Sequence, residues 1–326
     1  MPTLSEFVRV KKRYSRSVNL ERDVGIADSL LGYIPTSRTI DCVERFLRSF
    51  KFESSVRAWT LTGSYGTGKS SFANFLTALC SPKDDDVFKG AIKILKQTEK
   101  SDLLQKTIKS RLPDSGLIRA VVTAQREPIA TTVIRALDRG AKLYWQNRKG
   151  PKPYALYDLD KLSFKVKKGL SIDNNHLIEV MESLAQISKS GILLIIDELG
   201  KNLEFSAQNQ SMDDLYLLQQ IAEMTPSRDG YNVSIFGLLH QSFIDYAHGM
   251  ASAQRNEWAK IQGRFEDIPF IESADQMVRL VGKAIDRSMV ASPDWAIRKW
   301  ASNWHSVLSG TEVSNNFSAS SLRSVF

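Results

Sequence analysis

The sequence predicts an α/β fold in which a parallel sheet carries helices on both faces and a small helical lid follows at the C-terminal end. Short apolar, β-prone segments alternate with longer stretches of helical apolar spacing, a pattern typical of strands joined by helical crossovers. A glycine-rich turn follows the first predicted strand, and two adjacent carboxylates follow the third. Because ligands bind where the carboxyl ends of parallel strands meet, both segments are expected at one edge of the sheet.

The predicted elements alternate along the chain in the order that this fold requires. Four or five strands are expected, from the segments at 58–62, 117–123, 192–196, 233–239 and 268–271. Helices are expected at 37–50, 71–79, 86–111, 127–147, 174–188, 211–224, 242–262, 273–287 and 292–303. These elements divide the chain into an N-terminal arm, a core and a helical lid, at 1–36, 37–271 and 272–326. The core is expected to carry insertions at about 81–116 and 148–190, since Lys69 and Asp197 lie unusually far apart for a minimal core.

Residues 63–70 read G-S-Y-G-T-G-K-S, a complete Walker A pattern between a predicted strand and a predicted helix. Glycines allow the backbone amides to turn toward phosphate groups, and the helix N-terminus adds partial positive charge. Lys69 is expected to contact the β- and γ-phosphates of ATP, and Ser70 to ligate Mg²⁺. The predicted nucleotide contacts are Gly63, Ser64, Tyr65, Gly66, Thr67, Gly68, Lys69, Ser70 and Ser71. The alternative interpretation is a glycine-rich turn that matches the pattern by chance.

Residues 191–200 read G-I-L-L-I-I-D-E-L-G, a Walker B pattern. The apolar run suits a strand that is buried on both faces of a parallel sheet. Asp197 is expected to hold Mg²⁺ directly or through water, and Glu198 to polarise the water that attacks the γ-phosphate. The two patterns together predict an enzyme that converts ATP and water to ADP and phosphate, whereas an acidic turn after a strand is the structural alternative.

The composition is that of a soluble, cytoplasmic protein of 326 residues. No apolar run approaches the roughly 18 residues of a membrane span, and no signal sequence opens the chain, so no membrane association is expected. Cys42 and Cys80 are the only cysteines and are expected to be reduced thiols, which excludes a thiolate metal site. The four histidines show no metal-ligand spacing.

The net charge of +8 is concentrated in basic stretches at 9–16, 93–111 and 161–168. Such stretches are compatible with electrostatic binding of nucleic acid, DNA included. Solvated helix faces are the simpler interpretation and are slightly favoured, because no basic motif interleaved with aromatic residues is present.

When the segments that follow the Walker B pattern are included, the order of motifs along the chain resembles that of AAA+ ATPases. The resemblance implies a polar sensor at the end of the strand after Walker B, where His240 and Gln241 lie. It also implies an arginine that serves the neighbouring subunit, here Arg264, and therefore a homo-oligomer assembled through the nucleotide site. The usual sensor is Asn or Thr, so this chain departs from the pattern there. A surface arginine paired with Glu266 or Asp267 is the alternative for Arg264.

Further strings resemble a narrower group, the large bacterial ATPases of antiphage defence islands of the BREX and phage-growth-limitation types. They are D-E-L-G-K at 197–201, L-L-H-Q-S-F at 238–243, W-A-K-I-Q-G-R-F-E-D-I-P-F at 258–270 and R-E-P at 126–128. The resemblance implies other defence proteins as partners and action on or near DNA. It also implies that the chain is the N-terminal ATPase module of a longer protein, with a truncated lid.

Two other functions fit the same motifs. A slow nucleotide-held switch of the STAND type would bind ATP tightly and drive assembly of a defence complex. A P-loop kinase is less favoured, because no acceptor site is visible and Glu198 favours water as the nucleophile.

Overall fold

The computed structural model describes residues 9–10, 18–50, 56–98, 100–146, 148, 151–209, 212–225, 231–247, 250, 252–286 and 299. The chain forms two compact units. The larger unit comprises residues 18–270, and the smaller one comprises residues 1–17 together with residues 271–326.

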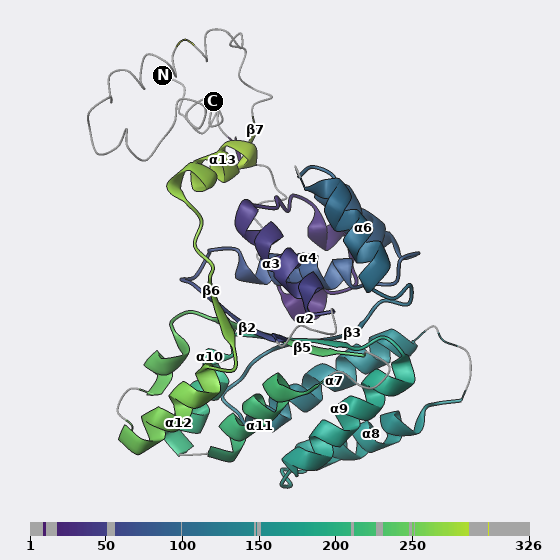
Figure 1. The fold of residues 1–326 in the computed structure, drawn as a ribbon, viewed down its shortest axis with the longest axis vertical. Coiled ribbons are helices and arrows are strands. Elements are labelled where there is room, and N and C mark those ends of the chain that lie inside the picture. The colour runs from purple at the N-terminus through teal and green to yellow at the C-terminus, as the bar shows by residue number, and fades with distance from the viewer. Residues whose placement is uncertain are drawn as a thin grey trace. The chain divides into compact units, whose positions relative to one another are not determined.

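A five-stranded parallel sheet is the centre of the larger unit (Figure 1). Its strand order is β3-β4-β5-β2-β6. The strands are β2 (Ala58–Thr62), β3 (Ile118–Thr123), β4 (Ile192–Asp197), β5 (Val233–Leu239) and β6 (Glu266–Pro269). Because all neighbouring strands are parallel, their carboxyl ends lie at one edge. β5 lies between the two strands that precede the Walker motifs.

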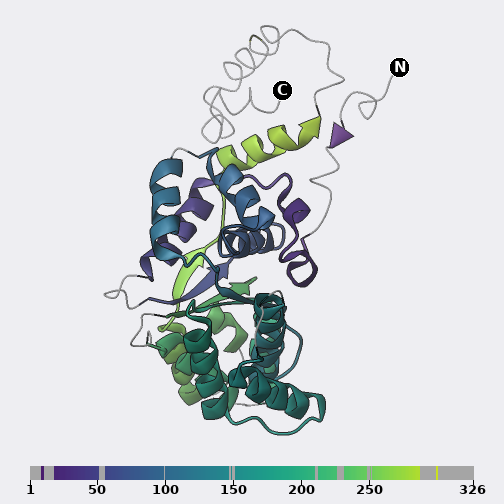
Figure 2. The ribbon, with the colours of Figure 1, turned by 90° about the vertical axis from the view of Figure 1, so that its right-hand side faces the viewer.

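Strand residues alternate between two apolar layers. On β4, Leu193 and Ile195 pack into one layer, whereas Leu194 and Ile196 pack into the other. Successive side chains of a strand point to opposite faces, so a strand that is apolar throughout needs helices on both sides. Figure 2 shows these helical layers on opposite faces of the sheet, which confirms the predicted α/β class.

The first layer contains the N-terminal helices and the helix of the Walker A motif. Its elements are α2 (Leu20–Asp23), η2 (Ala27–Leu30), α3 (Ser37–Arg48), α4 (Lys69–Leu79), α5 (Asp86–Leu95) and α6 (Ser101–Arg111). α3 begins with a capping box in which Thr36 and Thr39 bond each other's backbone amides. Asp85 caps α5. These local signals fix where each helix begins.

The second layer contains the helices that follow β3, β4 and β5. Its elements are α7 (Ile129–Trp145), α8 (Tyr154–Lys167), α9 (Asn174–Ser188), α10 (Gly200–Asn209), α11 (Met212–Glu223), η3 (Phe243–Ala247) and α12 (Ser252–Gln262). Their apolar residues form one core with the lower face of the sheet in Figure 1. Tyr144 of α7 donates to the Ser188 carbonyl oxygen at 2.9 Å, which ties the end of α9 to α7.

Several elements differ from those that the sequence predicts. α8 and α10 were not expected, the single helix predicted at 86–111 is two helices, and the last strand of the sheet begins at Glu266 rather than Ile268. α10 begins directly after the Walker B carboxylates. The sequence suggests only a turn there, because the residues that follow the strand are polar. Apart from residue 299, the helix predicted at 292–303 lies outside the described residues.

The smaller unit contains β1 (Arg9–Val10), α13 (Ala274–Ala284) and β7 (Ile285–Asp286), and β1 pairs with β7 in antiparallel fashion. Among the described residues of the whole chain, no helix combines the length and apolar character of a membrane span. Cys42 and Cys80 are buried and free, as the sequence predicts.

Candidate nucleotide-binding site

The Walker A segment forms a loop between the end of β2 and the start of α4. Gly66 and Gly68 adopt φ angles of +81° and +90°, which side chains with a Cβ rarely tolerate. Gly63 is fixed by packing instead, because a Cβ there would lie 2.7 Å from the Phe270 carbonyl oxygen. These three glycines therefore match the requirements of the backbone as well as the motif.

Lys69 is buried inside this loop, with 5% of its surface exposed. Its Nζ donates to the carbonyl oxygens of Gly63 and Ser64, the second at 2.9 Å. Burial lowers the pKa of Lys69, while the charge of Asp197 acts in the opposite direction. A buried ammonium bonded to neutral oxygens gains most from an anion, so the environment of Lys69 fits a phosphate group.

Ser70 and Asp197 connect the two motifs. The Ser70 hydroxyl donates to Oδ2 of Asp197 at 2.9 Å, although the residues come from different elements, α4 and β4. Both are hard oxygen ligands of the kind that Mg²⁺ prefers. The described residues contain no group of three or more acidic, histidine or cysteine side chains suited to a metal. Mg²⁺ at this position would therefore depend on phosphate oxygens and water for its other ligands.

Glu198 lies at the turn between β4 and α10. It adopts a φ of +55°, one of two non-glycine residues with positive φ in the described chain. Its amide donates to Oδ1 of Asp197 at 3.0 Å, and its carboxylate forms an ion pair with Lys201 on the first turn of α10. Such a backbone conformation costs about 1–3 kcal/mol and is typical of functional sites. Lys201 was not among the predicted site residues, although its position three residues after Glu198 is a usual helical ion-pair spacing.

His240 lies at the end of β5, and its ring stacks on Tyr65 of the Walker A loop. The ring centroids are 3.6 Å apart and the planes differ by 25°. Burial lowers the pKa of His240, the charges of Lys69 and Lys201 lower it further, and Glu198 acts in the opposite direction. These surroundings favour the neutral form of the imidazole. Gln241, the other sensor candidate, is exposed.

Tyr246 of η3 joins the loop after β4 to the loop after β5. A Cβ at Gly200 would clash with the Tyr246 hydroxyl, so α10 begins in direct contact with this ring. Burial raises the pKa of Tyr246, and the backbone amides of His240 and Gln241 act against this shift. Sequence reasoning missed Tyr246, because a lone tyrosine in a helical stretch carries no motif.

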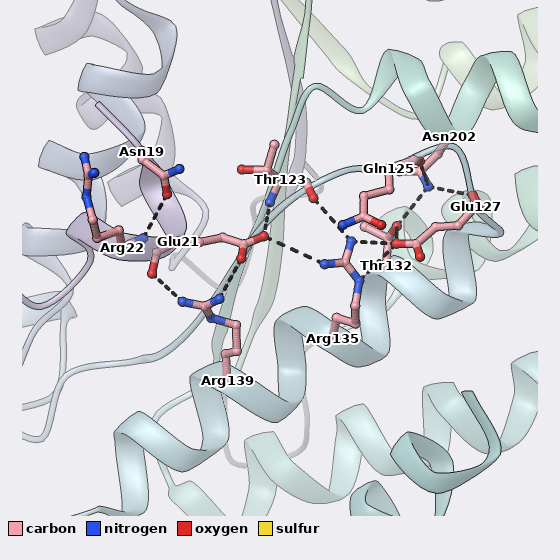
Figure 3. Close-up of polar contacts among 10 residues, drawn as sticks. All are labelled: Asn19, Glu21, Arg22, Thr123, Gln125, Glu127, Thr132, Arg135, Arg139 and Asn202. Atoms are coloured by element: carbon pink, nitrogen blue, oxygen red, sulfur yellow. Dashed lines mark hydrogen bonds and ion pairs between the residues drawn. The ribbon is translucent and has the colours of Figure 1, made fainter. Parts of the chain in front are cut away.

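Asn202 joins the Walker B helix to the loop after β3 (Figure 3). Its side-chain amide donates to the Glu127 carbonyl oxygen at 2.8 Å and to the Thr132 hydroxyl at 2.9 Å. Glu127 in turn accepts from Arg135 at 2.6 Å. The R-E-P string at 126–128 thus positions α7 against α10, and Arg126 itself forms an exposed ion pair with Glu204.

Arg264 lies apart from this cluster. β6 pairs with β2 so that Glu266 is opposite Trp59, which places Arg264 near the amino end of β2, whereas the Walker A loop follows its carboxyl end. The five residues of β2 separate the two ends by about 17 Å. Arg264 is therefore positioned away from the nucleotide site of its own chain.

The ion-pair partners suggested by the sequence for Arg264 are wrong. Its guanidinium pairs with Glu223 of α11 at 2.7 Å, and both side chains are half exposed. Glu266 instead binds Arg45 and Trp59. Asp267 accepts hydrogen bonds from Thr60 and Thr62. Both acids are thus engaged with the neighbouring elements rather than with Arg264.

Comparison with known proteins gives a limited result. No protein-family model matches the chain, and no curated protein is significantly similar. Among solved structures, the ORC2 protein of Aeropyrum pernix in its ADPNP–ADP complexes is similar with 16% identity and a TM-score of 0.45, covering 90% of this chain and 70% of that one. Its ADP form gives 15% identity and a TM-score of 0.46, covering 90% of this chain and 63% of that one. At these scores the function has to be argued from the site itself.

Proposed function

We propose that this chain is an Mg²⁺-dependent ATPase of the AAA+ type. The hydrogen bond between Ser70 and Asp197 carries the proposal, because it brings the ends of both Walker motifs together at the carboxyl edge of the sheet. The buried cation of Lys69 in the same loop supports it. A glycine-rich turn or an acidic turn alone would not require this convergence.

In the proposed reaction, the oxygen of water bonds to the γ-phosphorus and the bond between that phosphorus and the ADP oxygen breaks. Glu198 takes the proton of the attacking water, and Lys69 with the loop amides binds the phosphate charge. Mg²⁺ held by Ser70 and Asp197 would neutralise charge on the phosphate oxygens. His240 is the better sensor candidate, since its ring contacts the Walker A loop and Gln241 is exposed.

Replacement of Lys69 tests the proposed binding site. Lys69→Ala should weaken ATP binding about 100-fold, because charge-assisted hydrogen bonds to the phosphates are lost. Titration calorimetry with Mg²⁺ and a slowly hydrolysed ATP analogue measures the change. Lys89→Ala, which removes an exposed lysine of α5, is the matched control. Equal affinity in Lys69→Ala and wild type would rule out the Walker A assignment.

The titration of Asp197 predicts an effect on stability. Burial raises the pKa of Asp197, Glu198 adds to this, and the Ser70 hydrogen bond and Lys69 oppose it. A carboxyl group whose pKa is raised by folding destabilises the fold above that pKa, and this cost disappears as the pH falls. Asp197→Asn should therefore stabilise the nucleotide-free protein at pH 7 by about 0.5–2 kcal/mol.

Urea unfolding at several pH values tests this expectation. The advantage of Asp197→Asn should shrink as the pH falls through the raised pKa, because the wild-type carboxyl group becomes neutral as well. The Ser70 hydroxyl can reverse and accept from the new amide, so the local hydrogen bonds are retained. A variant that is less stable than wild type at pH 7 would contradict the prediction.

The slow-switch alternative is favoured by a different observation. In the structure the Glu198 carboxylate is ion-paired with Lys201, and the His240 ring is covered by Tyr65. Both catalytic candidates are thus engaged with protein groups, as a resting switch would require. Steady-state turnover distinguishes the two functions, since a switch releases about one phosphate per chain and then stops.

The biological context of the proposed ATPase is inferred only from the short sequence motifs that resemble the defence ATPases. It comprises a multi-component antiphage defence system in the bacterial cytoplasm, homo-oligomers formed through the nucleotide site, other defence proteins and DNA. The proposal of DNA binding can be tested at the basic residues. Lys167 and Lys168 are exposed at the end of α8, and neither forms an ion pair with another described residue. The stretch at 11–13 lies outside the described residues.

Charge reversal at the end of α8 tests DNA binding. If the patch contacts phosphates, Lys165, Lys167 and Lys168 changed together to Glu should weaken DNA binding. The slope of log affinity against log salt should also become shallower by about one per lost contact. Fluorescence anisotropy with duplex DNA over a salt series measures both, with Lys89→Glu as the control. Association that is absent or independent of salt would leave these lysines as solvated residues of the helix.

A further inference from the structure

The His240 ring is held in an unusual way. A functional histidine is ordinarily oriented by a hydrogen bond to one of its ring nitrogens. Here Nδ1 and Nε2 are both buried, and neither has a hydrogen-bond partner among the described residues. The stack on Tyr65 is therefore the specific contact that fixes the plane of this ring.

Tyr65 differs from the aromatic residues of the core. Its side chain is 76% exposed, so the ring is not held in place by apolar burial. It belongs to the loop whose carbonyl groups bind Lys69, two residues after Gly63 and one before Gly66 with its positive φ. A change in this loop when phosphate binds would thus be transmitted to the plane of His240 through the stacked rings.

We propose that Tyr65 is a positioning residue of the active site, which couples the Walker A loop to His240 by ring stacking and thereby favours hydrolysis of the triphosphate. The proposal rests on the ATPase function proposed above. It assigns the aromatic ring, and not the phenol hydroxyl, as the part of Tyr65 that matters. Phosphate contact is left to His240, whose ring nitrogens have no hydrogen-bond partner among the described residues.

The expected size of the effect follows from the strength of such contacts. Stacked aromatic pairs contribute the equivalent of about two- to tenfold in an equilibrium. Tyr65→Ala should therefore lower kcat about two- to tenfold with little change in the affinity for ATP. Tyr65→Phe, which keeps the ring, should retain the wild-type kcat. Tyr216→Ala removes another exposed tyrosine, on α11, and serves as the matched control.

A double-mutant cycle separates this role from direct contact with phosphate. If Tyr65 acts through His240, then Tyr65→Ala should have no further effect on kcat in a His240→Ala background. Independent, multiplicative effects in the double variant would overturn the proposal. So would a Tyr65→Phe variant as slow as Tyr65→Ala, because the hydroxyl would then be the active group.

A readout that needs no turnover uses the imidazole signals in NMR spectra, with His240 assigned from the His240→Ala variant. The charged groups that act on this ring are Lys69, Glu198 and Lys201. These three charged groups remain in the Tyr65→Ala variant. Water, however, gains access to the imidazole ring, so the pKa of His240 should rise toward its ordinary value. An unchanged pKa would overturn the proposal even in an inactive protein. Absence of ATP binding by wild type would instead refute the proposed function.

Discussion

Glu198→Gln should bind ATP as tightly as wild type and hydrolyse it about 10²–10⁴-fold more slowly. The amide of Gln can still hydrogen-bond a water molecule, but it cannot accept its proton. The substitution keeps the size of the side chain and the backbone amide that donates to Asp197. The loss is therefore expected in the chemical step rather than in the architecture of the turn.

Two measurements make this result specific. Binding of ATP in the presence of Mg²⁺ should be unchanged by calorimetry, while single-turnover phosphate release should slow by the stated factor. Glu204→Gln is the matched control, because Glu204 lies six residues later on α10 and pairs with exposed Arg126. Equal hydrolysis by Glu198→Gln and wild type would remove Glu198 as the general base.

The sequence predicts the centre of this site well for a physical reason. Short apolar runs rich in β-branched residues, such as 192–196, favour strands that are covered on both faces, and parallel strands end at a common edge. Polar residues in the segments that follow two such strands therefore lie at the same edge of the sheet and can come close together. Ser70 and Asp197 do so, although they are distant in the sequence. The five-stranded sheet follows from the same argument.

Other features depend on contacts that no local pattern encodes. Tyr65 fits a Walker A pattern that tolerates many residues at that place, so its stack on His240 is visible only once β5 lies beside β2. Tyr246 and Asn202 are single polar residues whose partners lie on other elements. The partner of Arg264 was mispredicted, because nearness in the sequence favoured Glu266 and Asp267, whereas the fold brings Glu223 alongside.

Arg264 carries the largest expected effect if chains assemble through the nucleotide site. A P-loop site needs a cation for the charge that develops on the γ-phosphoryl oxygens, and an arginine from a neighbouring subunit can provide it. Arg264 lies at the opposite end of β2 from its own Walker A loop, so it can act only on the site of another chain. Its ion pair with Glu223 is half exposed and is worth at most about 1 kcal/mol, so assembly can break it.

Arg264→Ala should bind ATP normally and hydrolyse it about 10³–10⁵-fold more slowly. Mixing it with Lys69→Ala should restore part of the activity, since one chain keeps an intact pocket and the other an intact arginine. Wild-type turnover should also rise faster than linearly with protein concentration until assembly is complete. Arg255→Ala, which removes an exposed arginine of α12, and Glu223→Gln are the controls. If Arg264 serves only as an ion-pair partner, Arg264→Ala and Glu223→Gln should behave alike, with near-normal hydrolysis and a small loss of stability. Loss of hydrolysis in Arg255→Ala instead would move the proposed contact to that residue.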